Sequence, residues 1–239
     1  MCTLTYRLNN HGYEVFFNRD EQRSRSLAIP PQFSQKHNAI YPIDPDGNGT
    51  WIAVNQQGLS LALLNNYQAP LSKQRDMTSR GQLILKLLQA EGDPLVHLQA
   101  MDLSIYQPFQ LCIFPKNVSI MKDDVYCLHW DGSSLVPVAM VLPVTSSSVD
   151  FSEVSQKRKQ LFHQLTCGQH PTSSQLKQFH FSTESLNKYS VNMQRPDAHT
   201  VSISHISVGQ DIRFEYFDNV TKQTKLIKHQ TVGSSSNQF

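Results

Sequence analysis

The chain has 239 residues, of which 39% are hydrophobic and 17% are charged, and its formal net charge is +2 with histidine neutral. These proportions are typical of a globular protein and exclude a disordered or fibrous chain. The small net charge and the scattered lysines and arginines disfavour nucleic-acid binding. No run approaches the ~20 apolar residues of a membrane-spanning helix, and the N-terminus lacks a secretory signal pattern. We therefore expect a cytoplasmic protein without a membrane span.

The first third of the chain alternates apolar and polar residues, which is the pattern of strands. Segments 2–8 (CTLTYRL) and 13–17 (YEVFF) flank the turn NNHG and predict a hairpin, and 50–55 and 59–67 flank QQG and predict a second. A helical pattern follows over 79–92, with Ser79 as its N-cap and Gly92 as its end. The apolar face of that helix contains Leu83, Ile84, Leu87 and Leu88.

The rest of the chain continues as strands and helices. Asp93 and Pro94 begin a short helix as cap and first residue. A long amphipathic helix is predicted over 150–168, capped by Asp150 or Ser152, with the basic run QKRKQ at 156–160 on its solvent face. Strand-like runs lie at 109–114, 119–130, 136–144, 199–208, 210–218 and 222–230.

The order of these elements is strands, a helix pair, strands, a helix and strands again. It indicates two antiparallel sheets with helices layered outside, in one α+β domain over residues 1–232, followed by a flexible tail at 233–239. The four cysteines form no CxxC pair, and Cys112 and Cys127 lie in apolar runs typical of buried side chains. We expect neither a metal nor a cofactor.

Cys2 directly follows the initiator methionine. Methionine is normally trimmed before a small residue, which would leave Cys2 with a free α-amine. That amine has a reference pKa of about 7.7–8.0 and can accept a proton, and a thiol with a pKa of about 8.5 is partly ionised. One residue would then supply nucleophile and base. The alternative is a frayed terminus without a role, which the strand pattern of the following residues disfavours.

The tetrapeptide NRDE at 18–21 closes the second strand of the first hairpin. Because hairpin strands are antiparallel, it should lie beside the start of the first strand. Arg19 can then hold a thiolate or a substrate carboxylate, and Asp20 can orient the α-ammonium. The alternative is a solvated surface turn, against which the proximity to Cys2 argues.

Two consecutive amides, Asn65 and Asn66, end the strand of the second hairpin. A rigidly held amide can donate to the oxyanion that forms when an acyl carbon becomes tetrahedral. A plain asparagine-rich turn explains the same stretch equally well.

Together with Cys2 and NRDE, the chain carries GTW at 49–51, GLSLALLNNY at 58–67 and SRGQLI at 79–84. In this order and spacing it resembles the NRDE family, also called the transport-and-Golgi-organization-protein-2 family. That family is similar in turn to the N-terminal-nucleophile hydrolases of the choloylglycine and penicillin-acylase type. The resemblance implies a four-layer αββα sandwich with the trimmed cysteine as nucleophile.

By that resemblance, Arg19 and Asp20 would flank Cys2, and a distant arginine near the C-terminal strands would complete the site. The nearest candidate is Arg195, although Asn192 and His199 depart from the relatives' pattern there. The candidate site comprises Cys2, Arg19, Asp20 and Asn66 as catalytic residues and Asn18, Asn65 and Arg195 as substrate-binding residues.

These features favour a cysteine amidohydrolase that cleaves a linear, non-peptide C–N bond of a small-molecule substrate. The alternative is a binding or trafficking protein that uses the same cleft for an apolar ligand such as haem or a lipid, because a hydrolase fold need not retain hydrolase function. A third reading, a redox-sensitive thiol at Cys2, gains little because no resolving cysteine is near in the sequence.

Overall fold

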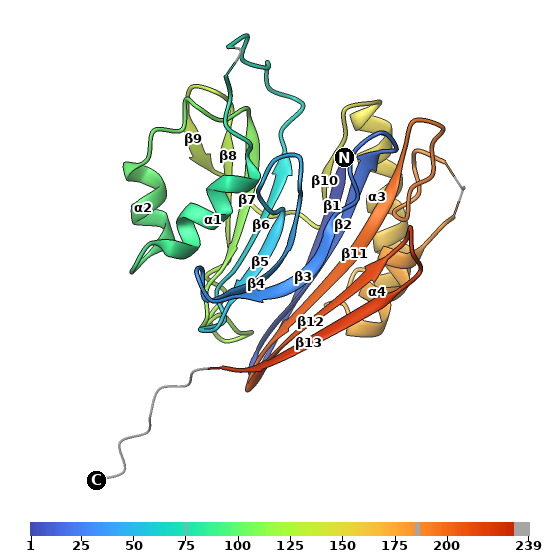
Figure 1. The fold of residues 1–239 in the computed structure, drawn as a ribbon. Coiled ribbons are helices and arrows are strands. Elements are labelled where there is room, and N and C mark those ends of the chain that lie inside the picture. Colours follow the sequence, from blue (N-terminus) through green and yellow to red (C-terminus); the bar gives the residue numbers. More distant parts are fainter. Residues whose placement is uncertain (75, 185–186, 232–239) are drawn as a thin grey trace.

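The computed structural model describes residues 1–74, 76–184 and 187–231, and in these ranges two antiparallel sheets face one another (Figure 1). Sheet A contains, in spatial order, β10 (Val144–Ser146), β1 (Cys2–Asn9), β2 (Gly12–Gln22), β11 (Ala198–Val208), β12 (Asp211–Asp218) and β13 (Thr224–Gln230). Sheet B contains β3 (Ile29–Ser34), β4 (Ala39–Ile43), β5 (Ile52–Asn55), β6 (Ser60–Asn65), β7 (Phe109–Phe114), β8 (Tyr126–Trp130) and β9 (Leu135–Pro137). The tail predicted at 233–239 lies outside the described residues.

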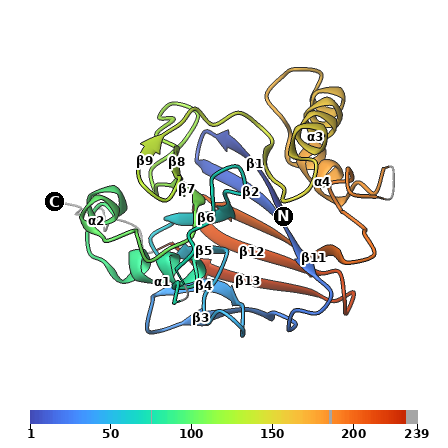
Figure 2. The same ribbon diagram turned by 90° about the horizontal axis from the view of Figure 1, so that it is seen from above.

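Helices cover the outer face of each sheet. They are α1 (Gly81–Gln89) and α2 (Pro94–Ala100) on sheet B, and α3 (Phe151–Thr166) and α4 (Ser173–Phe181) on sheet A. Seen from above, the two helix pairs lie on opposite sides of the paired sheets (Figure 2). The layers therefore run helix, sheet, sheet, helix, and the predicted αββα sandwich is confirmed.

The main core lies between the sheets and follows from strand periodicity. Tyr13, Val15 and Phe17 on β2 point inward, and their alternating neighbours point to the helix layer. They pack against residues of sheet B such as Ile52 and Phe114. A second apolar cluster lies under α1, whose Leu83, Ile84, Leu87 and Leu88 are buried as predicted.

Both predicted hairpins are present, and so are the strands predicted at the C-terminus. The helix predicted from Ser79 begins instead at Gly81, and that predicted cap is wrong because no side chain caps this end. The strand predicted over 119–130 is confined to β8, because residues 122–124 carry three successive exposed charges. Helix α4, which the strand-and-helix pattern did not predict, starts at a capping box formed by Thr172 and Gln175.

The described ranges contain no helix that is both long and apolar enough to cross a membrane.

Candidate active site

Cys2 and Arg19 are direct partners in the antiparallel pairing of β1 and β2. The prediction that NRDE lies beside the start of the first strand is therefore confirmed, although these residues belong to the strand itself rather than to a turn. On its other side Cys2 pairs with Ser146 of β10, so hydrogen-bonded strands flank it on both sides. The start of β1 is therefore held in the sheet.

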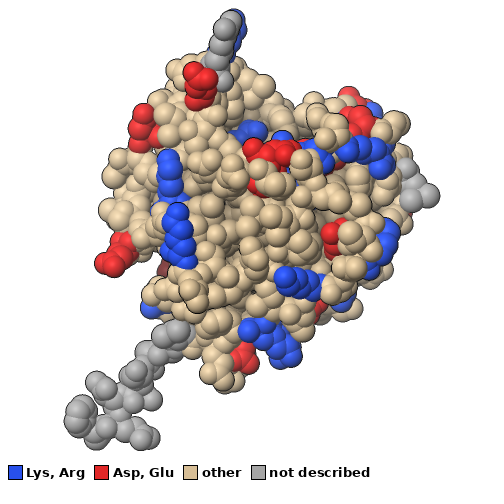
Figure 3. Space-filling model, viewed as in Figure 1, with Lys and Arg blue, Asp and Glu red and all other residues tan. Residues whose placement is uncertain are grey.

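A cavity of about 300 Å³ opens at this end of the sheets. From sheet A it is lined by Cys2, Arg19 and Asp20, from sheet B by Asn65, and from the loop before β5 by Trp51. Acidic and basic side chains gather at the upper edge of the molecule, between the two lobes formed by the sheets and their helices (Figure 3). The cavity is therefore charged, and it brings together residues far apart in the sequence.

Arg19 is almost fully buried, and three contacts fix its guanidinium group. It stacks over the ring of Trp51, 4.2 Å from the ring centre. One guanidinium nitrogen lies 3.3 Å from a carboxylate oxygen of Glu21 and 3.6 Å from one of Asp44. The same Asp44 carboxylate oxygen also forms an ion pair with a guanidinium nitrogen of Arg25, at 2.6 Å. This network makes Arg19 a rigid cation beside the thiol.

Two glycines bring the opposite wall of the cavity together. Gly49, in the loop before Trp51, packs backbone against backbone on Gly81 at the start of α1. A Cβ atom at Gly49 would lie 2.4 Å from the carbonyl carbon of Gly81. The Thr50 N–H donates to the Gly81 carbonyl over 3.1 Å and ties the two segments. The GTW and SRG sequences therefore meet at one contact, and both line the cavity.

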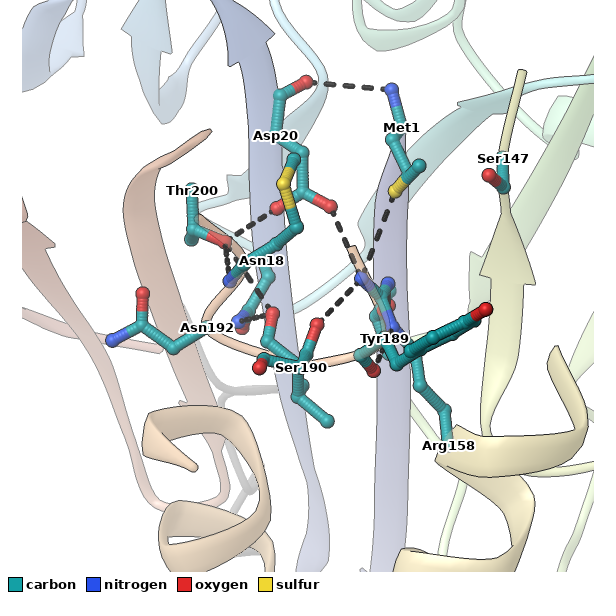
Figure 4. Close-up of polar contacts among 12 residues, drawn as sticks. Met1, Asn18, Asp20, Ser147, Arg158, Tyr189, Ser190, Asn192 and Thr200 are labelled. Carbon is teal, nitrogen blue, oxygen red and sulfur yellow. Dashed lines mark hydrogen bonds and ion pairs between the residues drawn. The ribbon is translucent and has the colours of Figure 1, made fainter. Parts of the chain in front are cut away.

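Asp20 points to the helix side of sheet A, where a fully buried arginine faces it (Figure 4). Arg158 of α3 lies 3.6 Å from one carboxylate oxygen, and the Thr200 hydroxyl donates to the other over 2.6 Å. Arg158 also donates to the Thr3 hydroxyl and, over 2.7 Å, to the Ser190 carbonyl. Arg158 of α3 and Thr200 of β11 thus hold this carboxylate, and Thr3 of β1 in turn holds Arg158.

Met1 extends the first strand and is itself buried. Its carbonyl accepts from the Asp20 N–H over 3.0 Å, and its ammonium lies 3.4 Å from the Asp20 carbonyl oxygen (Figure 4). Its side chain packs against Met193 and Ala198. Burial lowers the pKa of the Met1 ammonium, but the acidic groups around it, Cys2 first, outweigh this effect and raise that pKa. The main chain of Met1 is therefore held against the strand that carries Asp20.

Burial governs the two acids nearest the start of β1. It raises the pKa of the Cys2 thiol, against the opposing positive N-terminus. It also raises the pKa of the Asp20 carboxyl, against the opposing charge of Arg158. The thiol is therefore held neutral at rest, which differs from the partly ionised thiol expected from the sequence.

Asn65 is the amide of the predicted pair that lines the cavity, where its Nδ2 donates to the Tyr67 hydroxyl over 2.7 Å. Asn66 is not among the lining residues. Its side chain faces the Trp130 carbonyl on β8, at 3.4 Å. The structure therefore brings Asn65, rather than Asn66, close to Cys2.

Asn18 lies on the helix side of β2 and outside the cavity. Its Nδ2 donates to the carbonyls of His180 and Val191, so its Oδ1 accepts from Nδ1 of His180 over 2.6 Å. The other ring nitrogen of His180 then accepts from the Thr5 hydroxyl over 2.7 Å. Burial lowers the pKa of His180 well below its ordinary value, so the imidazole is neutral. These bonds join α4 to sheet A.

Arg195 is also absent from the cavity lining. It pairs with Asp197 two residues later, and its carbonyl accepts from Arg23. The buried arginine that reaches the NRDE segment is Arg158. Its run, 156–160, was predicted to lie in solvent, and that prediction is wrong for this residue. A signal was present, because position 158 is one helical turn after the buried Val154.

Among the residues that the structure describes, no group of three or more His, Cys, Asp or Glu side chains could hold a metal ion.

The fold belongs to the αββα sandwich class, with Cys2 at the start of a sheet strand. It is similar to the solved structure of a Caenorhabditis elegans N-acylethanolamine-hydrolyzing acid amidase ortholog, at 11% identity and a TM-score of 0.55. The match covers 86% of this chain and 92% of that one. At such low identity it shows the fold alone.

The family is set by a separate comparison. The model for Transport and Golgi organisation 2 matches residues 1–223, and the chain therefore belongs to that family. No curated protein matches the chain.

Proposed function

We propose that this chain is a cysteine N-terminal-nucleophile amidohydrolase that cleaves a linear, non-peptide C–N bond. The observation that carries the proposal is the direct pairing of Cys2 with Arg19 at the mouth of one charged cavity. Asp20, the next residue along β2, contacts the main chain of Met1 at the bond that processing would cleave. A frayed terminus would have none of these contacts.

In the proposed reaction, removal of Met1 frees the α-amine of Cys2. Because burial keeps the thiol protonated, attack requires a base within reach, and this amine is the nearest candidate. The amine takes the thiol proton as sulfur bonds to the acyl carbon, and passes it to the leaving nitrogen as the C–N bond breaks. Water then hydrolyses the thioester and restores the thiol. Asp20, backed by Arg158, orients the ammonium form.

The oxyanion of the tetrahedral intermediate needs a donor that faces the cavity. Asn65 meets this requirement because it lines the cavity and its side chain is fixed by Tyr67. We therefore assign the oxyanion role to Asn65, and a supporting role at the end of β6 to Asn66. The charged lining favours a polar substrate over the haem or lipid ligand of the alternative function.

The test is hydrolysis by the wild-type chain and the Cys2→Ala variant on a panel of linear acyl amides. The panel includes N-acylethanolamines, because the structurally similar amidase is named for them. We expect Cys2→Ala to lower the rate by at least about 10³-fold, since the attacking atom is lost. Intact mass should show a wild-type chain without Met1.

The matched control is Cys167→Ala, because Cys167 is an exposed thiol beyond the end of α3. It should leave the rate unchanged. A Cys2→Ala variant as active as wild type, or an active chain that keeps Met1, would remove this function.

A further inference from the structure

One of the positively charged side chains that line the cavity has no carboxylate partner among the lining residues. Three arginines line it: Arg19, Arg25 and Arg80. Of the lining acids, Asp20 faces Arg158 on the other side of the sheet, whereas Glu21 and Asp44 form ion pairs with Arg19 and Arg25. Arg80 is left over.

Arg80 is a partly buried guanidinium, and it forms no ion pair with a carboxylate in the described residues. Within the part of the chain that the structure describes, its one hydrogen bond runs from Nη1 to the Pro108 carbonyl over 2.9 Å. A guanidinium has five N–H donors, and burying its charge without an anion is costly. The side chain therefore keeps donors available toward the cavity that it shares with Cys2.

The start of helix α1, at the same wall, also favours an anion. Helix α1 begins at Gly81 without a side-chain cap and without an acidic residue in its first turn, and its first residue lines the cavity. The start of a helix carries partial positive charge.

We propose that Arg80 and the start of α1 form a subsite for an oxyanion carried by the substrate. The inference rests on the proposed function, because it places the anion, a carboxylate or a phosphate, on the molecule that Cys2 attacks. Arg80 is then a specificity-determining residue. The substrate differs from a neutral acyl amide by this anionic group.

The test uses two alkylating probes of the Cys2 thiol, anionic iodoacetate and neutral iodoacetamide, with the modified residue identified by peptide mass spectrometry. The ratio of the two rates at one thiol cancels its thiolate fraction and reports attraction of the anion. Exposed Cys167 is the internal reference. We expect the iodoacetate-to-iodoacetamide ratio to be about tenfold higher at Cys2 than at Cys167, because the subsite concentrates anions.

Arg80→Gln should bring the ratio at Cys2 down to that at Cys167, and Arg80→Lys should retain most of it. Arg23→Gln, an exposed arginine outside the cavity lining, should change nothing. Equal ratios at the two thiols in wild type, or an unchanged ratio in Arg80→Gln, would overturn the subsite. The experiment measures alkylation of Cys2 and not turnover. Its result therefore tests the subsite even if the chain is found not to be an amidohydrolase.

Protection of Cys2 from iodoacetamide, at equal ionic strength, separates the two sources of the oxyanion. Stronger protection by inorganic phosphate assigns the subsite to a phosphate group, and stronger protection by acetate assigns it to a carboxylate. Failure of both anions to protect Cys2 counts against the subsite.

Discussion

Arg158 shows how one buried charge can serve a site that it does not line. Its guanidinium is fully buried between α3 and sheet A, where it faces Asp20. The pair gives the NRDE carboxylate a fixed direction, and Thr200 holds its other oxygen. A buried ion pair adds little net stability but is costly to break, because the remaining charge is left unpaired.

We therefore expect Arg158→Met to lower the free energy of unfolding by about 3 to 5 kcal/mol at pH 7. The deficit should shrink as the pH falls, because a protonated Asp20 needs no cation and burial already raises its pKa. Urea unfolding at several pH values measures both effects.

The matched control is Lys157→Met, which changes the exposed neighbour on the same helix and should cost little. Asp20→Asn combined with Arg158→Met should recover part of the loss, since no charge is then stranded. A single Arg158→Met variant within about 1 kcal/mol of wild type would show that the pair is not required.

At the scale of elements, the cavity depends on the contact between the loop at 44–51 and the start of α1. Their closest approach is Gly49 on Gly81, where no side chain fits. The same contact places Trp51 under Arg19 and aims the start of α1 at the cavity. The GTW and SRG sequences can therefore pack together as one wall of the cavity only because each has a glycine at the contact.

Gly49→Ala should lower the free energy of unfolding by about 1 to 3 kcal/mol, because its Cβ would meet backbone atoms that cannot turn aside. It should also lower the iodoacetate preference of Cys2, since Arg80 moves with Gly81. Gly209→Ala is the control: its Cβ would meet only an ordinary contact of 3.8 Å, and we expect a near-neutral effect. Equal stability of the two variants would contradict this account.

At the scale of the whole molecule, the faces of sheet A differ. The inner face packs on sheet B through an apolar core. The outer face meets α3 and α4 through buried polar groups, among them Thr5, Asn18, Arg158 and His180. Apolar burial therefore stabilises the contact between the two sheets, whereas hydrogen bonds and ion pairs help to hold α3 and α4 on sheet A.

Glu14 is the clearest polar tie at the far end of this layer. It accepts from Arg7, Ser173 and His205, over 2.5, 2.6 and 2.9 Å, and so joins β1, α4 and β11 to β2. Burial alone would raise its pKa, but these hydrogen bonds outweigh burial and lower the pKa of Glu14 to about 2.

A carboxyl with a lowered pKa stabilises the fold above its ordinary value of 4.5 and loses that contribution as the pH falls toward 2. Between pH 5 and pH 2 we expect wild type to lose about 1 to 2 kcal/mol more than Glu14→Gln, after allowing for partial solvent screening. Thermal unfolding across this range measures the difference. The control is Glu215→Gln, which changes a carboxylate 4.0 Å from the same histidine, His205. This variant should lose as much stability between pH 5 and pH 2 as wild type does.

Much of the fold was predictable because its signals are local. Strand periodicity predicts the two hairpins, and the antiparallel pairing predicts NRDE beside the start of the first strand, where the structure pairs Cys2 with Arg19. Helix periodicity likewise identified the four buried residues of α1. In each case the direction of a side chain follows from its position along one strand or helix.

The partners across elements were decided only by the tertiary structure. Arg158 meets Asp20 because α3 packs on sheet A at β10 and the long arginine side chain reaches Thr3 of β1 and Asp20 of β2. Arg80 reaches the cavity because Gly81 packs on Gly49. Asn65 lines the cavity that Cys2 also lines, whereas Asn66, beyond the end of β6, faces the Trp130 carbonyl. A sequence specifies which groups exist and which way each one points along its own element, whereas the stacking of the layers decides which of them meet.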